Sequence, residues 1–129
     1  MVIDTSALAA IFFGEPERQK FLTAITSTAT RLVSAATVLE TGIVIESRLG
    51  DSAGREFDLF LVRANLQIVP VGAEQTELAR SAWRRFGKGR HSAALNYGDC
   101  FVYALAKWSG EPLLAKGTDF SSTDIAVLP

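Results

Sequence analysis

The chain has 129 residues, a length typical of one domain with its own apolar core, so we expect a single domain over residues 1–129. Hydrophobic residues make up 48% of the sequence, which excludes a disordered chain. Lys and Arg number 13 and Asp and Glu 14, for a formal net charge of −1. No overall field therefore attracts nucleic acid, and any anion-binding site must be built locally.

The only cysteine is Cys100, which excludes an internal disulfide and is typical of a reducing compartment. The first residues lack the pattern of a secretory leader, and the longest apolar stretch, residues 7–13, is too short to cross a bilayer. We therefore expect a cytoplasmic protein with no membrane partner.

Short apolar strands and helices alternate along the chain. Residues 2–3 form the first expected strand, Thr5 or Ser6 can cap a helix that begins at Ala7, and Pro16 suits the first turn of the next helix. Later strands are expected at residues 31–33, 66–71 and 113–115, with a weaker fifth at 125–128. The remaining helices are expected at about residues 36–49, 51–64 (capped by Asp51), 74–86 and 96–109.

This alternation predicts an α/β fold, a three-layer sandwich whose central parallel sheet of four or five short strands is covered by helices on both faces. Ligands of such sheets bind beyond the carboxyl ends of the strands, where the strand order reverses. Residues directly after the strands are therefore the first candidates for a functional site.

Three aspartates stand at strand ends or helix starts. Asp4 follows the first strand, Asp119 follows the strand at 113–115, and Asp99 lies in the first turn of the helix at 96–109. Each has an ordinary structural explanation as well, because aspartate caps helices, suits the helix dipole and forms turns. The sequence alone leaves both explanations of Asp4 open.

Glu40 is the more informative acid. Its neighbours three and four positions away on the predicted helix are Ala36, Thr37, Ile43 and Val44. A lone glutamate on such a stripe loses hydration and needs a partner or a cation. An arginine at the edge of the core is the ordinary alternative, but the cost of burying a carboxylate with no basic residue nearby favours a functional role.

If these four carboxylates meet in one cleft, their charges repel each other. A hard divalent cation, Mg²⁺ or Mn²⁺, would relieve the repulsion because it prefers oxygen ligands. One histidine and one cysteine cannot form a conventional zinc site, and no glycine-rich phosphate loop is present. The convergence itself depends on the predicted fold.

The densest positive segment spans residues 83–91 and contains no acid. It carries four cations and the only histidine: Arg84, Arg85, Lys88, Arg90 and His91. The segment is either an ordinary solvated helix end or a rim that binds phosphates beside the acids. Nothing pairs the histidine with a nucleophile, so Ser-His-Asp catalysis is disfavoured.

Four segments together carry a resemblance to a known family. The opening Val-Ile-Asp-Thr-Ser-Ala-Leu of residues 2–8 resembles the start of PIN domains, in particular the VapC toxins of bacterial toxin–antitoxin pairs. Residues 34–40, 96–101 and 113–120 resemble the second, third and closing acidic segments of that family. The segments occur in the family's order and span nearly the whole chain.

The resemblance implies a PIN fold, Mg²⁺ or Mn²⁺ dependence, endoribonuclease activity on RNA, a cognate VapB-type antitoxin and a homodimer. It implies these metal-site acids and catalytic residues: Asp4, Glu40, Asp99 and Asp119. Thr5 and Ser6 are expected to support the acids, and Lys116 joins the basic segment as a candidate RNA contact. Many relatives carry an acid or asparagine two residues before the last aspartate, where this chain has Gly117.

Other interpretations remain open at this point. Aspartyl phosphotransfer also uses an aspartate after a strand, but the haloacid-dehalogenase type needs a second acid where this chain has Ser6. A non-catalytic RNA- or protein-binding module with a relict metal site is the other alternative; the intact carboxylates argue against it, but Gly117 leaves it open. The large apolar residues at element ends either fill the core or form partner surfaces: Phe12, Phe13, Trp83 and Trp108.

Overall fold

The computed structural model describes all 129 residues. Its four parallel strands form one sheet in the order β3-β2-β1-β4: β1 (Val2–Ile3), β2 (Leu32–Ser34), β3 (Gln67–Val69) and β4 (Leu113–Leu114). Six α-helices and a short 3-10 helix complete the fold: α1 (Thr5–Phe12), α2 (Arg18–Thr26), α3 (Ala35–Leu49), α4 (Asp51–Arg63), α5 (Ala73–Phe86), α6 (Tyr97–Ser109) and η1 (Asp119–Ser122).

The predicted α/β sandwich with a parallel sheet is confirmed, with four strands. The expected fifth strand is reduced to a single parallel bridge between Leu113 and Val127. The strand order reverses beside β1, because β2 and β3 lie on one side of it and β4 on the other. The residue that follows β1 therefore lies where ligands of such sheets bind.

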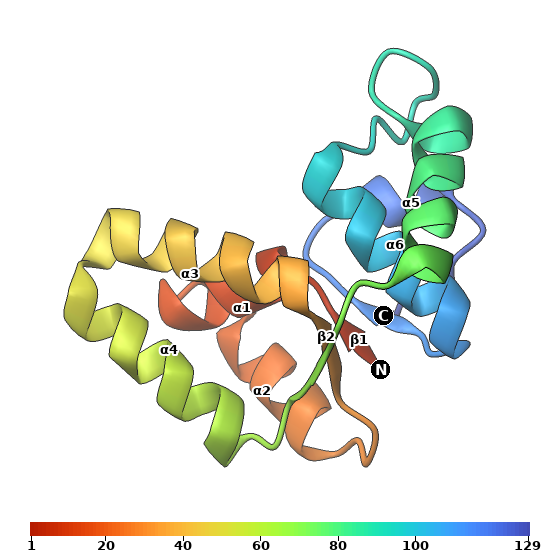
Figure 1. Cartoon of the computed structure of the whole chain (residues 1–129). Helices are drawn as coiled ribbons and strands as arrows, with labels where there is room; N and C mark the ends of the chain where they lie inside the picture. The colour runs from red at the N-terminus through yellow and green to blue at the C-terminus, as the bar shows by residue number, and fades with distance from the viewer.

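Successive strand residues serve two separate cores, which is why the strands are apolar throughout. Val2 belongs to a core shared with α5 and α6, whereas Ile3 belongs to a core shared with α1, α2 and α4. Figure 1 shows these helix groups on opposite sides of β1 and β2, with α3 crossing above α1 beside the sheet. The loop between α5 and α6 projects away from the sheet.

Several helix starts differ from the expectation. Gly50 with φ +88° caps α4, and Asp51 is the first helical residue rather than the cap. Pro16 lies before Glu17, the cap of α2, and so stands outside its first turn. Phe12 and Phe13 are half-buried, whereas Trp83 and Trp108 are exposed. No helix combines the length and apolar character that a membrane span requires.

Candidate active site

Asp4 is a buried carboxylate at the carboxyl end of β1. It, rather than Thr5 or Ser6, is the cap of α1. Its Oδ2 accepts hydrogen bonds from the Ser6 amide at 3.0 Å and the Ser6 hydroxyl at 2.5 Å. The Ser6 hydroxyl in turn accepts the backbone N–H of Lys116 at 2.9 Å, which joins the ends of β1 and β4. Ser6 therefore fixes the orientation of Asp4.

Glu40 reaches the same region from α3. Its Oε1 accepts the Thr5 hydroxyl at 2.6 Å, and the Thr5 oxygen accepts the hydroxyl of the buried Thr41 at 3.1 Å. The predicted apolar stripe around Glu40 is wrong in part, because the side chain of Ile43 is 55% exposed and that of Val44 also faces solvent. Glu40 itself is half-buried, at the edge of the core rather than on its face.

Gly98 is a site residue that the sequence did not reveal. The carboxylate of Glu40 lies directly against it, since a Cβ added there would stand 2.2 Å from Oε2. A side chain at position 98 would therefore have to displace the carboxylate of Glu40 from the first turn of α6. A glycine inside a predicted first helical turn, next to a candidate acid, was the available signal, because glycine disfavours helix interiors.

Asp99 combines a structural and an electrostatic role. It forms a capping box with Asn96, in which each side chain accepts the other's backbone N–H at 2.9–3.0 Å. Burial, together with the charges of Asp4, Asp119 and Glu40, raises the pKa of Asp99 to about 6, although the backbone hydrogen bond from Asn96 acts to lower it. Asp4, Glu40 and Asp119 therefore lie within electrostatic range of Asp99.

The pKa of Asp4 is raised as well. Burial raises its pKa above the ordinary value despite the bonds from Ser6, and the charge of Glu40 adds to the rise. Asp119 begins η1 and is exposed. Two residues before it, Gly117 adopts φ +90°, a conformation that favours glycine. The loop therefore brings one acid, rather than two, toward the cluster.

The donor set suits a hard cation, because it consists of carboxylate and hydroxyl oxygens. Asp4, Glu40 and Asp99 each use one oxygen in the hydrogen bonds above, and the second oxygen of each accepts no hydrogen bond from the protein. As arranged here, no three carboxylate, histidine or cysteine side chains are close enough together to hold a metal ion. Hydrogen bonds from Ser6, Thr5 and Asn96 orient Asp4, Glu40 and Asp99, respectively.

The basic candidates separate into two groups. Arg84, Lys88 and Arg90 line a groove of about 840 Å³ between α5 and α6. Exposed His91 follows them, with its Nδ1 accepting the Ala93 N–H at 3.0 Å and its ring edge-on to Phe86.

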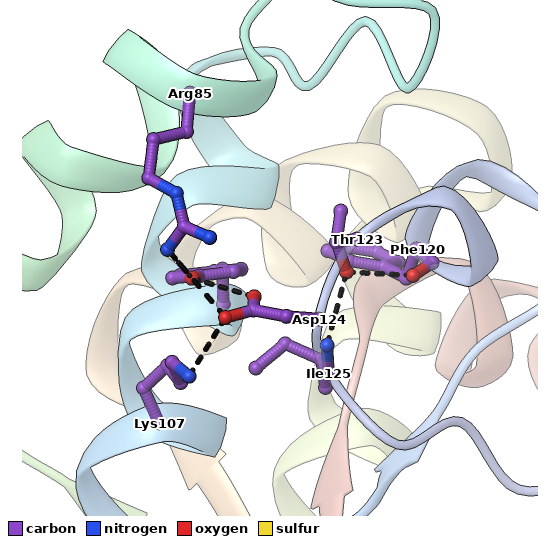
Figure 2. A network of polar contacts seen from close by, with 7 residues as sticks. Arg85, Lys107, Phe120, Thr123, Asp124 and Ile125 are labelled. Carbon is purple, nitrogen blue, oxygen red and sulfur yellow. Dashed lines mark hydrogen bonds and ion pairs between the residues drawn. The ribbon is translucent and has the colours of Figure 1, made fainter.

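Arg85 and Lys116 are engaged in ion pairs instead. Arg85 lies 3.5 Å from Asp124, which also accepts Lys107 at 2.8 Å, as Figure 2 shows. The Lys116 ammonium pairs with Glu15 and lies 3.6 Å from Glu17. The structure does not place these two cations with the groove.

Comparison with known proteins assigns the family. Residues 1–126 match the model of the PIN domain. The chain belongs to the PIN-domain family. It is 56% identical over 128 residues to Ribonuclease VapC30 of Mycobacterium tuberculosis, an alignment that covers 99% of this chain and 98% of that protein.

Two solved structures share this PIN fold. The sarcin-ricin-loop-cleaving toxin VapC20 of M. tuberculosis superposes with a TM-score of 0.80 at 20% identity, covering 98% of this chain and 97% of that one. VapBC2 of Rickettsia felis, bound to a promoter DNA fragment, superposes with a TM-score of 0.77 at 14% identity. The match covers 99% of this chain and 96% of that one. At these identities the two structures support the PIN fold alone.

Proposed function

We propose that this protein is a metal-dependent endoribonuclease, the toxin of a VapBC toxin–antitoxin pair. One observation carries the proposal: Asp4 at the end of β1 and Glu40, whose carboxylate lies against Gly98, are both within electrostatic range of Asp99, in a PIN chain 56% identical to a VapC ribonuclease. Clustered carboxylates without basic partners cost stability, so they indicate a function that needs them.

Mg²⁺ or Mn²⁺ would be held by the carboxylates of Asp4 and Asp99, with Glu40 and Asp119 completing the site directly or through water. When bound, the ion supplies a Lewis acid for the scissile phosphate and lowers the pKa of a water. Ser6 keeps Asp4 oriented, and Thr5 does the same for Glu40. These hydroxyls therefore preorganise the acids before any ligand arrives.

RNA is the proposed substrate. The free cations of the α5–α6 groove, Arg84, Lys88 and Arg90, lie beside the helix that carries Asp99 and suit a phosphate backbone. Because the formal net charge of the chain is −1, this local surface rather than the whole molecule would attract the RNA.

A VapB-type antitoxin and a second copy of the chain are the proposed partners. Large apolar side chains remain exposed on the adjacent helices α3 and α4, among them Leu39 and Ile43 on α3 and Leu59 and Val62 on α4. Surfaces of this kind are typical of protein interfaces. The R. felis neighbour is itself a VapBC assembly.

The test is cleavage of total bacterial RNA by purified, antitoxin-free protein with Mg²⁺, Mn²⁺ or EDTA. Discrete fragments that require metal and disappear with Asp99→Asn are expected, and mapping their ends identifies the target. Asn keeps the capping bonds, so a folded control is available. Equal cleavage by parent and Asp99→Asn would refute the proposed site, and no cleavage with either metal would favour a non-catalytic binding module.

A further inference from the structure

We propose that the groove between α5 and α6 binds an unpaired segment of the substrate, with a base stacked on the aromatic side chains of Trp83 and Tyr97. This inference rests on the proposed function only in taking RNA as the substrate. It adds a base-binding subsite to the phosphate contacts already described.

The groove presents exposed aromatic surface. Tyr97 is 81% exposed and Trp83 is 45% exposed, although rings of this size are ordinarily covered. Tyr97 is supported from below by Phe101, edge-on with the ring centroids 4.9 Å apart. Exposed, supported rings are the platforms on which proteins stack unpaired bases.

Trp83 is held in place rather than free to rotate. The Arg90 guanidinium lies over its ring, 4.1 Å from the centroid. On another side Gly87 admits the indole, since a Cβ there would stand 2.6 Å from Trp83 Cδ1. An ordered indole loses little conformational entropy when a base stacks on it. Arginine planes stack bases as well, so Arg90 can extend the same platform.

The charge of the groove selects a polyanion as its occupant. Its lining holds Arg80, Arg84, Lys88 and Arg90 and no acid. Only Arg80 has an ion-pair partner, Glu77 on its own helix. A two-fold contact between two copies through this groove would set the same cations against each other. Single-stranded RNA offers phosphates for the cations and bases for the rings.

The lining of the groove includes residues that adjoin the proposed cleavage site. Asn96 lies in its lining and exchanges both capping hydrogen bonds with Asp99. Tyr97, the next residue, is followed at once by Gly98, against which the Glu40 carboxylate lies. A base on Tyr97 would therefore place a neighbouring phosphate toward the acids, so the groove would select which phosphate is cut.

Binding can be measured without cleavage by Trp83 fluorescence. The chain has two tryptophans, and Trp108 lies at the far end of α6, bonded to Glu74. In the full chain carrying Trp108→Phe, titration with a mixed-sequence 2′-O-methyl octanucleotide in EDTA should quench Trp83. The same octanucleotide with abasic sites should bind more weakly and leave Trp83 unquenched.

Tyr97→Ala should weaken binding of the intact octanucleotide about tenfold, the loss typical of one stacked base. Tyr97→Phe should bind as the parent does, and Tyr97→Ala should not further weaken binding of the abasic strand. Lys88→Ala should weaken both strands alike and reduce the dependence of affinity on salt. Circular dichroism establishes that each variant is folded.

Unchanged affinity in Tyr97→Ala, or equal quenching by intact and abasic strands, would overturn the proposal. So would conversion of a dimer to monomers by Tyr97→Ala, since a second copy would then cover the groove. If base-dependent binding is found while no metal supports cleavage, the nuclease proposal fails and the base-binding groove stands. If the protein cleaves RNA but Tyr97→Ala leaves binding unchanged, the base-binding groove fails and the nuclease proposal stands.

Discussion

Asp99 and Asp124 are aspartates in opposite electrostatic surroundings. Burial and the charges of other acids raise the pKa of Asp99 to about 6. Partial burial also acts to raise the pKa of Asp124, but bonds from Lys107 and Tyr103, with the charges of Lys107 and Arg85, lower it to about 2. Figure 2 shows Asp124 directed toward both cations.

The surroundings of these two aspartates indicate different roles, one in stability and one in function. The Asp124 network satisfies its charges and joins α5, α6 and the C-terminal segment, so it stabilises the fold. The hydrogen-bond partners of the acids around Asp99 include no basic side chain, so the charges of these acids repel one another. We infer that the Asp124 network stabilises the fold and that the acids around Asp99 bind a ligand.

The largest expected effect is on catalysis. Asp4→Asn should reduce metal-dependent RNA cleavage at least about a hundredfold, because a proposed metal ligand loses its charge. Asp124→Asn should leave the rate within about twofold. Initial rates on one defined RNA would measure both, and comparable losses in the two variants would abolish the distinction drawn here.

Gly98→Ala should reduce cleavage about tenfold, because its Cβ would displace the Glu40 carboxylate from Asp99. The matched control is Gly42→Ala on α3, where an added Cβ meets nothing within 4 Å. Both substitutions improve helix propensity, and circular dichroism of each variant distinguishes a loss of activity at the site from a loss of folding. Full activity in Gly98→Ala would mean that the position of Glu40 does not matter.

The Asp124 network should appear in the pH dependence of stability. A carboxyl with a lowered pKa stabilises the fold above its unfolded pKa and loses this contribution as pH falls toward 2. Asp124→Asn should therefore cost about 1 kcal/mol at neutral pH, after allowance for solvent screening of a side chain that is 34% exposed. The difference from the parent in urea unfolding should shrink between pH 4 and pH 2. A constant difference would contradict the assigned ion pairs.

The smallest effect is expected from Thr5→Val, which removes the hydroxyl that bonds Glu40 and leaves the Thr41 hydroxyl without its acceptor. Cleavage should fall about two- to fivefold, the size of one net hydrogen bond. Thr5→Ser keeps the hydroxyl and should restore the rate. Equal losses in both variants would point to packing rather than to the bond.

The layered fold and the position of Asp4 followed from the sequence, because apolar runs, caps and turn residues act locally. The place of Asp99 in the first turn of a helix was also predicted and is confirmed, whereas its proximity to the other acids depended on the predicted fold. Glu40 was selected for a partly wrong reason, since Ile43 on its predicted apolar stripe faces solvent.

Contacts between distant segments could not be predicted. The packing of Glu40 on Gly98 joins α3 to α6, and the pairing of Arg85 with Asp124 joins α5 to the C-terminal segment. Lys116 is likewise engaged by Glu15, about a hundred residues earlier in the chain. A local pattern of charges identifies cations but says nothing about which of them the tertiary fold neutralises.

Calorimetric titration of Mn²⁺ into the parent and Asp99→Asn, with thermal unfolding of each, tests the central claim most directly. The parent should bind Mn²⁺ and unfold at a higher temperature with it, because binding to the folded state alone stabilises that state. Asp99→Asn should be at least as stable without metal, because one repelling charge is gone, yet should gain nothing from Mn²⁺. Equal binding and stabilisation in both proteins, or none in the parent, would contradict a cation site built on these carboxylates.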